Sequence, residues 1–361
     1  METDSKHALS VEHDAPFPED IQTAPLLQIS LAKLLEHDVK EIQRFTQACE
    51  TLGFFYLDLR GPGDTILAQS NELFNVGQSL LSLPLEEKKK YDFEHLNTYF
   101  GYKKMGGTAI DQTGTLDRNE FYNVSKDDIF DISKRWPAPT VLESNRSLLK
   151  SFITEAHSIV TLLLEILNKY LELPDGTLPS MHRLHLPGGD QVRFIKAPPQ
   201  PKDDRQTALG EHTDFGSITV LFNRLGGLQV LPPGRDSEWC YVKPLAGHAI
   251  INLGDALVKF TNGLLRSNIH RVVAPPGAQA SHTRYSLVYF NRPEDSVFLR
   301  RLDYGEKIPP LAKGEPEEEI CSKDWILRRA LGSRPHLSDT GAFDLSKSRG
   351  TETLSQRLGR D

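Results

Sequence analysis

The feature that most constrains the fold of this chain is a change of sequence pattern at Pro174. Before it, apolar positions recur at helical spacing over about 30–51, 64–83 and 144–171, which predicts long amphipathic helices. After it, short apolar runs alternate with Pro- and Gly-rich turns. These runs are 192–195, 218–222, 228–231, 249–253, 270–273 and 285–290. Many short strands with regular turns are typical of a sandwich or barrel, so we predict an α+β chain with a β core.

The same patterns predict how the chain is organised. The predicted segments are a loose N-terminal tail at 1–24, a helical and mixed region at 25–174, the β core at 175–300, a C-terminal helix within 301–332 and a disordered tail at 333–361. Within the second segment, residues 54–57 are predicted to form a buried strand and 97–140 to be irregular. The last helix is expected at about 317–329.

Charge narrows the range of functions. The chain has 361 residues, with 42 Lys or Arg against 49 Asp or Glu, a net charge of −7. This charge offers no long-range attraction to phosphate backbones or anionic lipid. The longest apolar stretch, 159–167, is too short to span a bilayer, and residues 1–24 lack the apolar core of a secretory leader. We expect a cytoplasmic protein, a monomer or weak homodimer, whose partner is a small molecule rather than nucleic acid or membrane.

Cysteine usage excludes two further classes of protein. Cys49, Cys240 and Cys321 are widely spaced and form no C-x-x-C pair. An odd, scattered set encodes neither a disulfide framework nor a thiolate zinc cluster. The chain therefore fits a reducing compartment.

The segment around His212 offers a candidate metal site. His212 and Asp214 are two positions apart, so an extended chain would point both side chains to the same side. His270 begins another strand-like run 58 residues later, as expected for a second strand of one barrel. Two histidines and one carboxylate form the facial triad of non-haem Fe(II) oxygenases. On its own, an H-x-D pattern is more often a hydrogen-bonded surface pair, so this hypothesis needs further support.

Arg284 and Ser286 supply that support. They follow His270 by 14 and 16 residues and share one strand face, so a guanidinium and a hydroxyl would converge on one anionic group. Arginine is well suited to bidentate recognition of a carboxylate. An Fe(II) site beside such an anchor is the arrangement expected for 2-oxoglutarate, whose keto-acid end chelates iron while its distal carboxylate meets the anchor.

Further motifs accompany these residues in a fixed order. They are Gly53-Phe-Phe-Tyr-Leu57, Leu83-Pro-Leu-Glu-Glu-Lys88, Gly101-Tyr102, His212-Thr-Asp-Phe-Gly-Ser217, Gly227-Leu-Gln-Val230, Ile251-Asn-Leu-Gly-Asp255, Thr261-Asn-Gly263, His270-Arg-Val272 and Arg284-Tyr-Ser-Leu-Val-Tyr-Phe-Asn-Arg-Pro293. With them, residues 25–300 resemble the 2-oxoglutarate and Fe(II)-dependent dioxygenases of the isopenicillin-N-synthase-like group. The resemblance implies a double-stranded β-helix (jelly roll) core wrapped by N-terminal and flanking helices. It also implies that His212, Asp214 and His270 bind iron, while Arg284 and Ser286 bind 2-oxoglutarate.

One departure from the family concerns the co-substrate. Where many plant members have Asn-Tyr-Tyr-Pro-Pro, with a tyrosine that touches the co-substrate, this chain has Ile195-Lys-Ala-Pro-Pro199. Ala197 cannot donate that hydrogen bond, so either Lys196 or another residue replaces it, or the co-substrate is held differently.

A second histidine pair, His182 and His185, lacks a nearby carboxylate and is expected in an exposed strand or turn rather than at a metal.

The resemblance also implies an activity. It implies an oxidoreductase that uses Fe(II), O2 and 2-oxoglutarate, releases succinate and CO2, and hydroxylates, desaturates or ring-closes a small, specialised metabolite. Ascorbate is a candidate for keeping the iron reduced. The candidate substrate residues are Phe290, Arg193, Lys196, Arg292 and Tyr102. If the basic ones face inward, they imply an acidic or carbonyl-bearing substrate, whereas a core aromatic or solvated surface charges are the simpler interpretations.

Three alternatives stay open. An iron-dependent oxidase of the same scaffold would not use 2-oxoglutarate, and Arg284 and Ser286 would bind a substrate carboxylate instead. A zinc hydrolase would need a general base, for which Glu211 is the adjacent candidate. A non-catalytic jelly roll would bind a metabolite without turnover.

Overall fold

The computed structural model describes residues 15–110, 114–201, 207–234, 237–304, 306–314, 318–332 and 350–352. Most of the loose tail predicted at 1–24, and nearly all of the disordered tail predicted at 333–361, lie outside the described residues.

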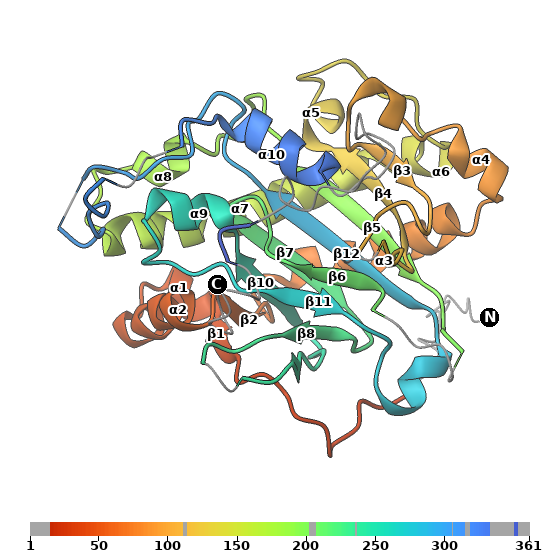
Figure 1. Cartoon of the computed structure of the whole chain (residues 1–361), viewed down its shortest axis with the longest axis horizontal. Coiled ribbons are helices and arrows are strands. Elements are labelled where there is room, and N and C mark those ends of the chain that lie inside the picture. Colours follow the sequence, from red (N-terminus) through yellow and green to blue (C-terminus); the bar gives the residue numbers. More distant parts are fainter. Residues whose placement is uncertain are drawn as a thin grey trace, which may run out of the picture.

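Two facing sheets form the centre of the protein (Figure 1). The larger sheet has the order β1-β2-β10-β7-β12-β5-β4-β3 and the smaller one β6-β11-β8-β9, with all neighbours antiparallel except β1 and β2. The strands are β1 Leu27–Ser30, β2 Phe54–Asp58, β3 Gly101–Lys103, β4 Glu120–Ser125, β5 Gln191–Ala197, β6 Leu209–His212, β7 Ile218–Asn223, β8 Leu228–Val230, β9 Cys240–Tyr241, β10 His248–Leu253, β11 His270–Val272 and β12 Arg284–Asn291. The predicted α+β class is confirmed.

Helices cover the side of the larger sheet that faces away from the smaller one (Figure 1). The long helices α3 Asp64–Leu81 and α7 Arg146–Tyr170 lie on this side. The other helices are α1 Leu31–Leu35, α2 Val39–Thr51, α4 Leu85–Lys89, α5 Lys126–Ile129, α6 Thr140–Glu143, α8 Thr177–Ser180, α9 Asp255–Phe260 and α10 Ser322–Leu331, with 3-10 turns at Glu94–Leu96 and Gly277–Ser281. Phe152 of α7 meets Phe222 of β7 with ring centroids 6.0 Å apart. This contact joins the longest helix to the sheet.

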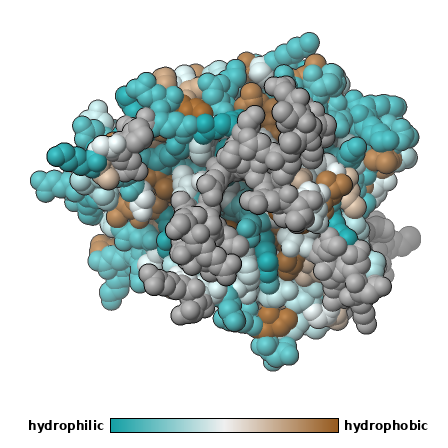
Figure 2. Space-filling model, viewed as in Figure 1, coloured by the Kyte–Doolittle hydropathy of each residue, from teal (hydrophilic) through white to brown (hydrophobic). Residues whose placement is uncertain are grey.

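By length and composition, α7 alone among the described helices could cross a membrane. Its apolar side chains instead pack against α3 and β12, as in the core helix of a folded domain. On the coloured part of the face shown in Figure 2, hydrophilic residues predominate and hydrophobic ones form small separate groups.

Several elements differ from the sequence prediction. The helix predicted at 30–51 is two helices, because the chain turns at His37 (φ 56°) and Asp38 caps a new start by accepting from the Glu41 N–H at 2.8 Å. The region predicted to be irregular, 97–140, contributes β3 and β4 to the larger sheet. The final helix begins at Ser322 rather than near residue 317.

Strand alternation separates two environments on the larger sheet. On β12, Leu287 and Tyr289 point into the helix-side core, whereas Arg284, Ser286 and Phe290 point toward the smaller sheet. A second apolar cluster fills part of the space between the sheets, with Phe54, Tyr56, Leu228, Val230 and Ile250 among its members. The space between the sheets is therefore where polar residues predicted to be functional gather.

Candidate active site

The structure brings His212, Asp214 and His270 together. His212 ends β6 and His270 begins β11, and the two are direct cross-strand neighbours with ring centroids 4.2 Å apart. Asp214 follows β6, and its Oδ1 lies 4.0 Å from Nε2 of each histidine. Candidate ligand atoms of all three lie within 4.8 Å of one another, and within the described ranges no other His, Cys or carboxylate group of three does so.

Hydrogen bonds orient each candidate ligand. Nδ1 of His212 donates to the Gly210 carbonyl at 2.8 Å, and Nδ1 of His270 donates to the Asn268 carbonyl at 3.0 Å. Because Nδ1 of each imidazole is used in a hydrogen bond to a backbone carbonyl, Nε2 is the ring atom that each histidine can offer to a metal.

The carboxylate of Asp214 is oriented in the same way. Its Oδ2 accepts from Thr219 Oγ1 at 2.6 Å and from Asn252 Nδ2 at 2.7 Å. Oδ1, the oxygen nearest the histidines, is left for a metal. Sequence reasoning missed Thr219 and Asn252, although Asn252 stands in the Ile251–Asp255 motif, because only the strand register brings them to Asp214.

The charges at the triad suit a cation. Burial, with the His270 imidazole beside it, holds the pKa of His212 well below its ordinary value, so His212 is neutral at pH 7. Burial alone would raise the pKa of Asp214, but the two imidazoles and the hydrogen bonds from Thr219 and Asn252 outweigh it and lower the pKa. Two imidazoles and one ionised carboxylate are the ligand set of a non-haem Fe(II) site.

Arg284 and Ser286 form a second polar site on the same face of β12. Arg284 is buried, its Nε donates to the Gly226 carbonyl at 2.8 Å, and burial lowers its pKa to about 10, so it remains charged at pH 7. Within the described residues, no carboxylate lies at ion-pair distance from it. Gly227 lies directly beside its side chain with φ +105°, a conformation that glycine adopts readily.

Unsatisfied polar atoms lie beside this guanidinium. Ser286 Oγ is buried and has no hydrogen-bond partner in the part of the chain that the structure describes. Asn223, its cross-strand neighbour on β7, has a buried Nδ2 atom that likewise has no hydrogen-bond partner among the described residues. Buried polar groups without a partner are costly unless a ligand or water meets them. A charged arginine with a hydroxyl and an amide beside it fits the distal carboxylate of 2-oxoglutarate. The sequence analysis did not predict Asn223 as part of this carboxylate site.

Comparison with known sequences agrees with this geometry. The family described as the 2OG-Fe(II) oxygenase superfamily matches residues 189–293, and an N-terminal family described as "non-haem dioxygenase in morphine synthesis N-terminal" matches 24–139. The 2-oxoglutarate-dependent dioxygenase gloE of Glarea lozoyensis is 32% identical over 283 residues, covering 78% of this chain and 84% of that protein. The chain belongs to the 2-oxoglutarate and Fe(II)-dependent oxygenase superfamily.

Further relatives support the enzyme class. A 2-oxoglutarate-dependent dioxygenase of Aspergillus fumigatus is 32% identical over 338 residues, which cover 86% of each chain. A Neurospora crassa protein solved with α-ketoglutarate and 5-formyluracil has the same fold, with a TM-score of 0.71 at 23% identity over 87% of this chain and 97% of that one. The protein is thus a 2-oxoglutarate-dependent dioxygenase with the predicted jelly-roll fold, and its cofactors are Fe(II) and 2-oxoglutarate.

Two of the predicted substrate residues of this dioxygenase lie near the triad. Phe290 pairs across strands with Thr219, the residue that holds Asp214. Arg193 of β5 stacks its guanidinium on Phe290, with 4.9 Å to the ring centroid, and on Phe121 of β4, with 4.2 Å. Its Nε donates to Asn123 Oδ1 at 2.7 Å. Phe121 and Asn123 therefore help to orient Arg193.

Arg292 also belongs to this region of the dioxygenase. The interpretation of Arg292 as a solvated surface charge is wrong, because the residue is buried. Its Nη1 donates to the Gly189 carbonyl at 2.6 Å, and its guanidinium lies 5.8 Å from the Phe290 centroid. Its Nε has no hydrogen-bond partner among the described residues.

The structure places Lys196 and Tyr102 away from the dioxygenase site, so their prediction as substrate residues is wrong. Lys196 alternates with Arg193 and Ile195 on β5 and points to the helix side, where its Nζ lies 3.3 Å from Glu120. Tyr102 is buried on that same side and donates to Glu120 Oε2 at 2.7 Å. Lys196 therefore does not replace the missing tyrosine at Ala197, which faces the interior opposite Arg284.

His182 corrects another expectation. It lies in a turn, as predicted, but it is buried rather than exposed. Its Nδ1 donates to the Leu178 carbonyl at 2.7 Å and its Nε2 accepts from Ser217 Oγ at 2.6 Å. Both ring nitrogens are thus used structurally, which agrees with the prediction that His182 is not a metal ligand.

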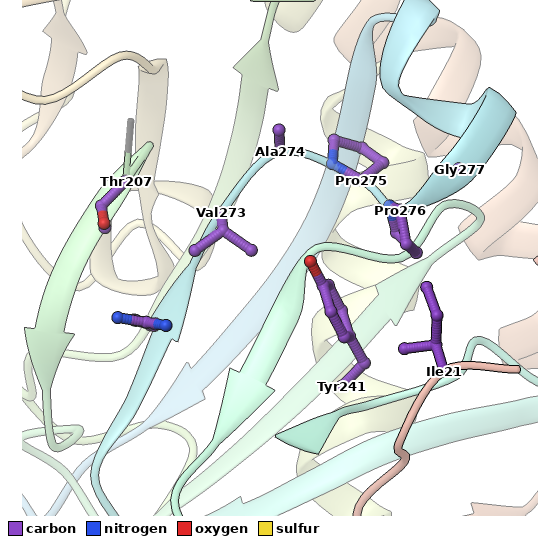
Figure 3. Close-up of a pocket in the computed structure, with 9 residues that line it drawn as sticks. Ile21, Thr207, Tyr241, Val273, Ala274, Pro275, Pro276 and Gly277 are labelled. Carbon is purple, nitrogen blue, oxygen red and sulfur yellow. The ribbon is translucent and has the colours of Figure 1, made fainter. Parts of the chain in front are cut away.

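A hollow of about 360 Å³ lies on the outer face of the smaller sheet, separate from the triad (Figure 3). Thr207, Tyr241 and Val273 line it. Arg271 lines it as well, because β11 alternates and turns Arg271 outward where His270 turns inward. Glu211 also alternates with His212 on β6 and interacts electrostatically with Arg271, so it is not placed to act as a base at the triad.

Proposed function

We propose that the dioxygenase oxidises a C–H bond of a small, specialised metabolite, by hydroxylation, desaturation or ring closure, with release of succinate and CO2. His212, Asp214 and His270 would hold Fe(II), and Arg284 and Ser286 would hold the distal carboxylate of 2-oxoglutarate. The observation that carries this proposal is the buried Arg284 guanidinium beside a Ser286 hydroxyl that no described residue hydrogen-bonds, on the strand face that also presents Phe290.

Bound iron with 2-oxoglutarate supplies the oxidising chemistry when O2 enters the site. The residues of the chain supply position and charge. The Gly210 and Asn268 carbonyls keep both imidazoles in the tautomer that binds metal through Nε2. Thr219 and Asn252 hold Oδ2 of Asp214, so only Oδ1 turns toward the histidines. Preorganised ligands of this kind need little rearrangement when the metal binds.

Phe290, Arg193 and Arg292 would contact the substrate. Phe290 offers an apolar surface next to the residue that orients Asp214. Arg193 would present its positive charge to an acidic or carbonyl oxygen of the substrate, while Phe121 and Phe290 hold the guanidinium plane. This arrangement favours a substrate with an apolar body and one anionic or carbonyl group.

The decisive experiment measures succinate under air with Fe(II), 2-oxoglutarate and a panel of small carboxylic acids, each paired with its methyl ester. The proposal predicts that some acids stimulate succinate formation with matching formation of an oxidised product. Turnover that needs iron but not 2-oxoglutarate would instead identify an oxidase of the same scaffold. Metabolite binding without any turnover would identify a non-catalytic protein.

Arg193→Met tests the substrate assignment directly. We expect the variant to raise KM for the preferred acid about tenfold or more and to change KM for 2-oxoglutarate little, since a hydrogen bond to a charged group contributes about 1.5–3 kcal/mol. Arg224→Met is the matched control, because Arg224 stacks on Phe74 of α3 on the helix side, 4.5 Å from the ring centroid. An unchanged KM in Arg193→Met would contradict the assignment.

A further inference from the structure

Helix α10 lies against the outer side of residues 212–216, which we call the ligand turn because it contains His212 and Asp214. Trp325 Nε1 donates to the carbonyl of Phe215 at 3.0 Å. The Arg329 guanidinium stacks on the Phe215 ring, 4.5 Å from its centroid. The C-terminal helix thus contacts the ligand turn through both backbone and side chain.

Arg329 makes a buried ion pair behind the ligand turn. Its side chain is 1% exposed and that of its partner, Asp255, is 0% exposed, with Arg329 Nη1 paired to Asp255 Oδ2. Arg329 Nη2 also donates to the Thr213 carbonyl at 3.1 Å. Thr213 stands between His212 and Asp214, so one guanidinium bonds both a buried carboxylate and the backbone between two candidate metal ligands.

Asp255 completes the connection to the ligand turn. Its Oδ2 accepts from Thr213 Oγ1 at 2.9 Å, and its backbone N–H donates to the Asp214 carbonyl at 2.8 Å. Its other oxygen, Oδ1, accepts from Thr351 Oγ1 at 2.6 Å. The carboxylate therefore ties the ligand turn to α10 and to residues 350–352, and none of these contacts involves the substrate residues.

We propose that Arg329 is a positioning residue that sets the metal affinity of the triad from outside the barrel. A guanidinium fork bonds two acceptors in a fixed geometry, which a lysine ammonium cannot reproduce. Without it, Asp255 is a buried charge with one partner fewer, and the Thr213 carbonyl loses its donor. The ligand turn then samples backbone positions in which His212 and Asp214 no longer meet His270. The proposal rests on the triad assignment of the proposed function, but not on its substrate.

The test measures Mn(II) binding to the metal-free, full-length chain by electron paramagnetic resonance, because Mn(II) is stable in air and takes nitrogen and oxygen ligands. Arg329→Met is expected to weaken binding about 10- to 100-fold, the usual effect of losing a group that orients a metal ligand. Arg329→Lys is expected to recover part of that loss. Arg135→Met, which removes an exposed arginine paired with Asp131, should bind like wild type.

Further variants separate a positioning role from a purely structural one. The double variant Arg329→Met/Asp255→Asn removes both buried charges and so remains informative if Arg329→Met fails to fold. Weakened Mn(II) binding in a folded double variant supports the proposal, and wild-type affinity in either folded variant overturns it. Asp214→Ala is titrated in parallel. Wild-type binding there would refute the triad and this proposal together, whereas its loss leaves the Arg329 variants to decide the positioning role.

Discussion

Thr219 and Asn252 both donate to the same oxygen of Asp214 and leave the other oxygen facing the two histidines. A carboxylate held in this way cannot rotate to offer Oδ2 to a metal without losing two buried hydrogen bonds. The geometry of the metal site therefore depends on residues that never touch the metal.

Thr219→Val tests this dependence. The substitution keeps the shape of the side chain and removes its hydroxyl, so Asp214 loses its shortest hydrogen bond. We expect Mn(II) affinity, measured by isothermal titration calorimetry, to fall about 10- to 100-fold. Thr154→Val is the matched control, since Thr154 is an exposed residue of α7 whose hydroxyl bonds the Lys150 carbonyl. Equal affinity in wild type and Thr219→Val would contradict the account.

Arg284→Lys tests the co-substrate anchor. Lysine keeps a positive charge at this buried position but loses the planar fork. We expect KM for 2-oxoglutarate to rise about 10- to 100-fold, because hydrogen bonds to charged groups contribute roughly 1.5–3 kcal/mol. The affinity for Mn(II) alone should not change. A steady-state titration of 2-oxoglutarate that gives the wild-type KM would refute the anchor.

The rule that residues i and i+2 share a strand face predicted correctly that His212 faces the same side as Asp214, and Arg284 the same side as Ser286. It could not tell which face Lys196 takes, because that depends on the register between β5 and β12. A shift of one residue exchanges the two faces. Asn223 and Thr219 were missed for the same reason.

At the scale of elements, β3 and β4 show why the sequence predicted residues 97–140 to be irregular. In β4, Glu120 and Tyr122 face the helices, while Phe121 and Asn123 face the interior. A buried ion pair between Glu120 and Lys88 and a hydrogen bond from Asn123 to the Tyr99 carbonyl satisfy polar groups on both faces. Because polar residues occupy both faces, no alternation of apolar and polar residues reveals the strand.

The packing of α3 on β5 leads to a stability prediction. Gly77 of α3 lies so close to the sheet that an added Cβ would come within 2.7 Å of the buried Phe194 ring. Gly77→Ala gains helix propensity but overpacks this contact, so we expect a net loss of about 1–3 kcal/mol in the free energy of unfolding. Urea denaturation of wild type and Gly77→Ala measures this difference in the free energy of unfolding. A variant more stable than wild type would show that α3 moves away from β5 at no cost.

At the scale of the whole molecule, two apolar cores pack different layers of the protein together. The larger core joins the helices to the back of the eight-stranded sheet, and the smaller one separates the two sheets. The order of motifs along the sequence was enough to predict this architecture. The contacts of α10 and residues 350–352 with the ligand turn were not predictable, because they join segments far apart in the sequence and show no periodic pattern.

Buried His182 predicts acid sensitivity of the whole fold. Burial lowers its pKa to about 4, below the value of about 6.5 expected in the unfolded chain. The unfolded state therefore binds the extra proton first, so this contribution to stability is complete above pH 6.5 and is lost as the pH falls toward 4. The loss is at most about 1.4 kcal/mol per pH unit.

Comparing wild type with His182→Gln isolates this contribution. Urea unfolding of the metal-free proteins at pH 7.5 and pH 5.0 should show a smaller pH effect in the variant, although its stability at pH 7.5 is lower because the bonds to Leu178 and Ser217 change. The same pH effect in both proteins would assign the acid sensitivity to other groups.

The most direct test of the central claim is an anaerobic titration of the metal-free protein with Fe(II) and then 2-oxoglutarate, followed by the weak visible absorption of the iron–2-oxoglutarate chelate. The account predicts that wild type develops this band at one iron and one 2-oxoglutarate per chain, and that Asp214→Ala develops none. A wild-type protein that binds iron without the band would contradict the assignment of 2-oxoglutarate as the co-substrate. An Asp214→Ala variant that keeps the band would contradict the assignment of His212, Asp214 and His270.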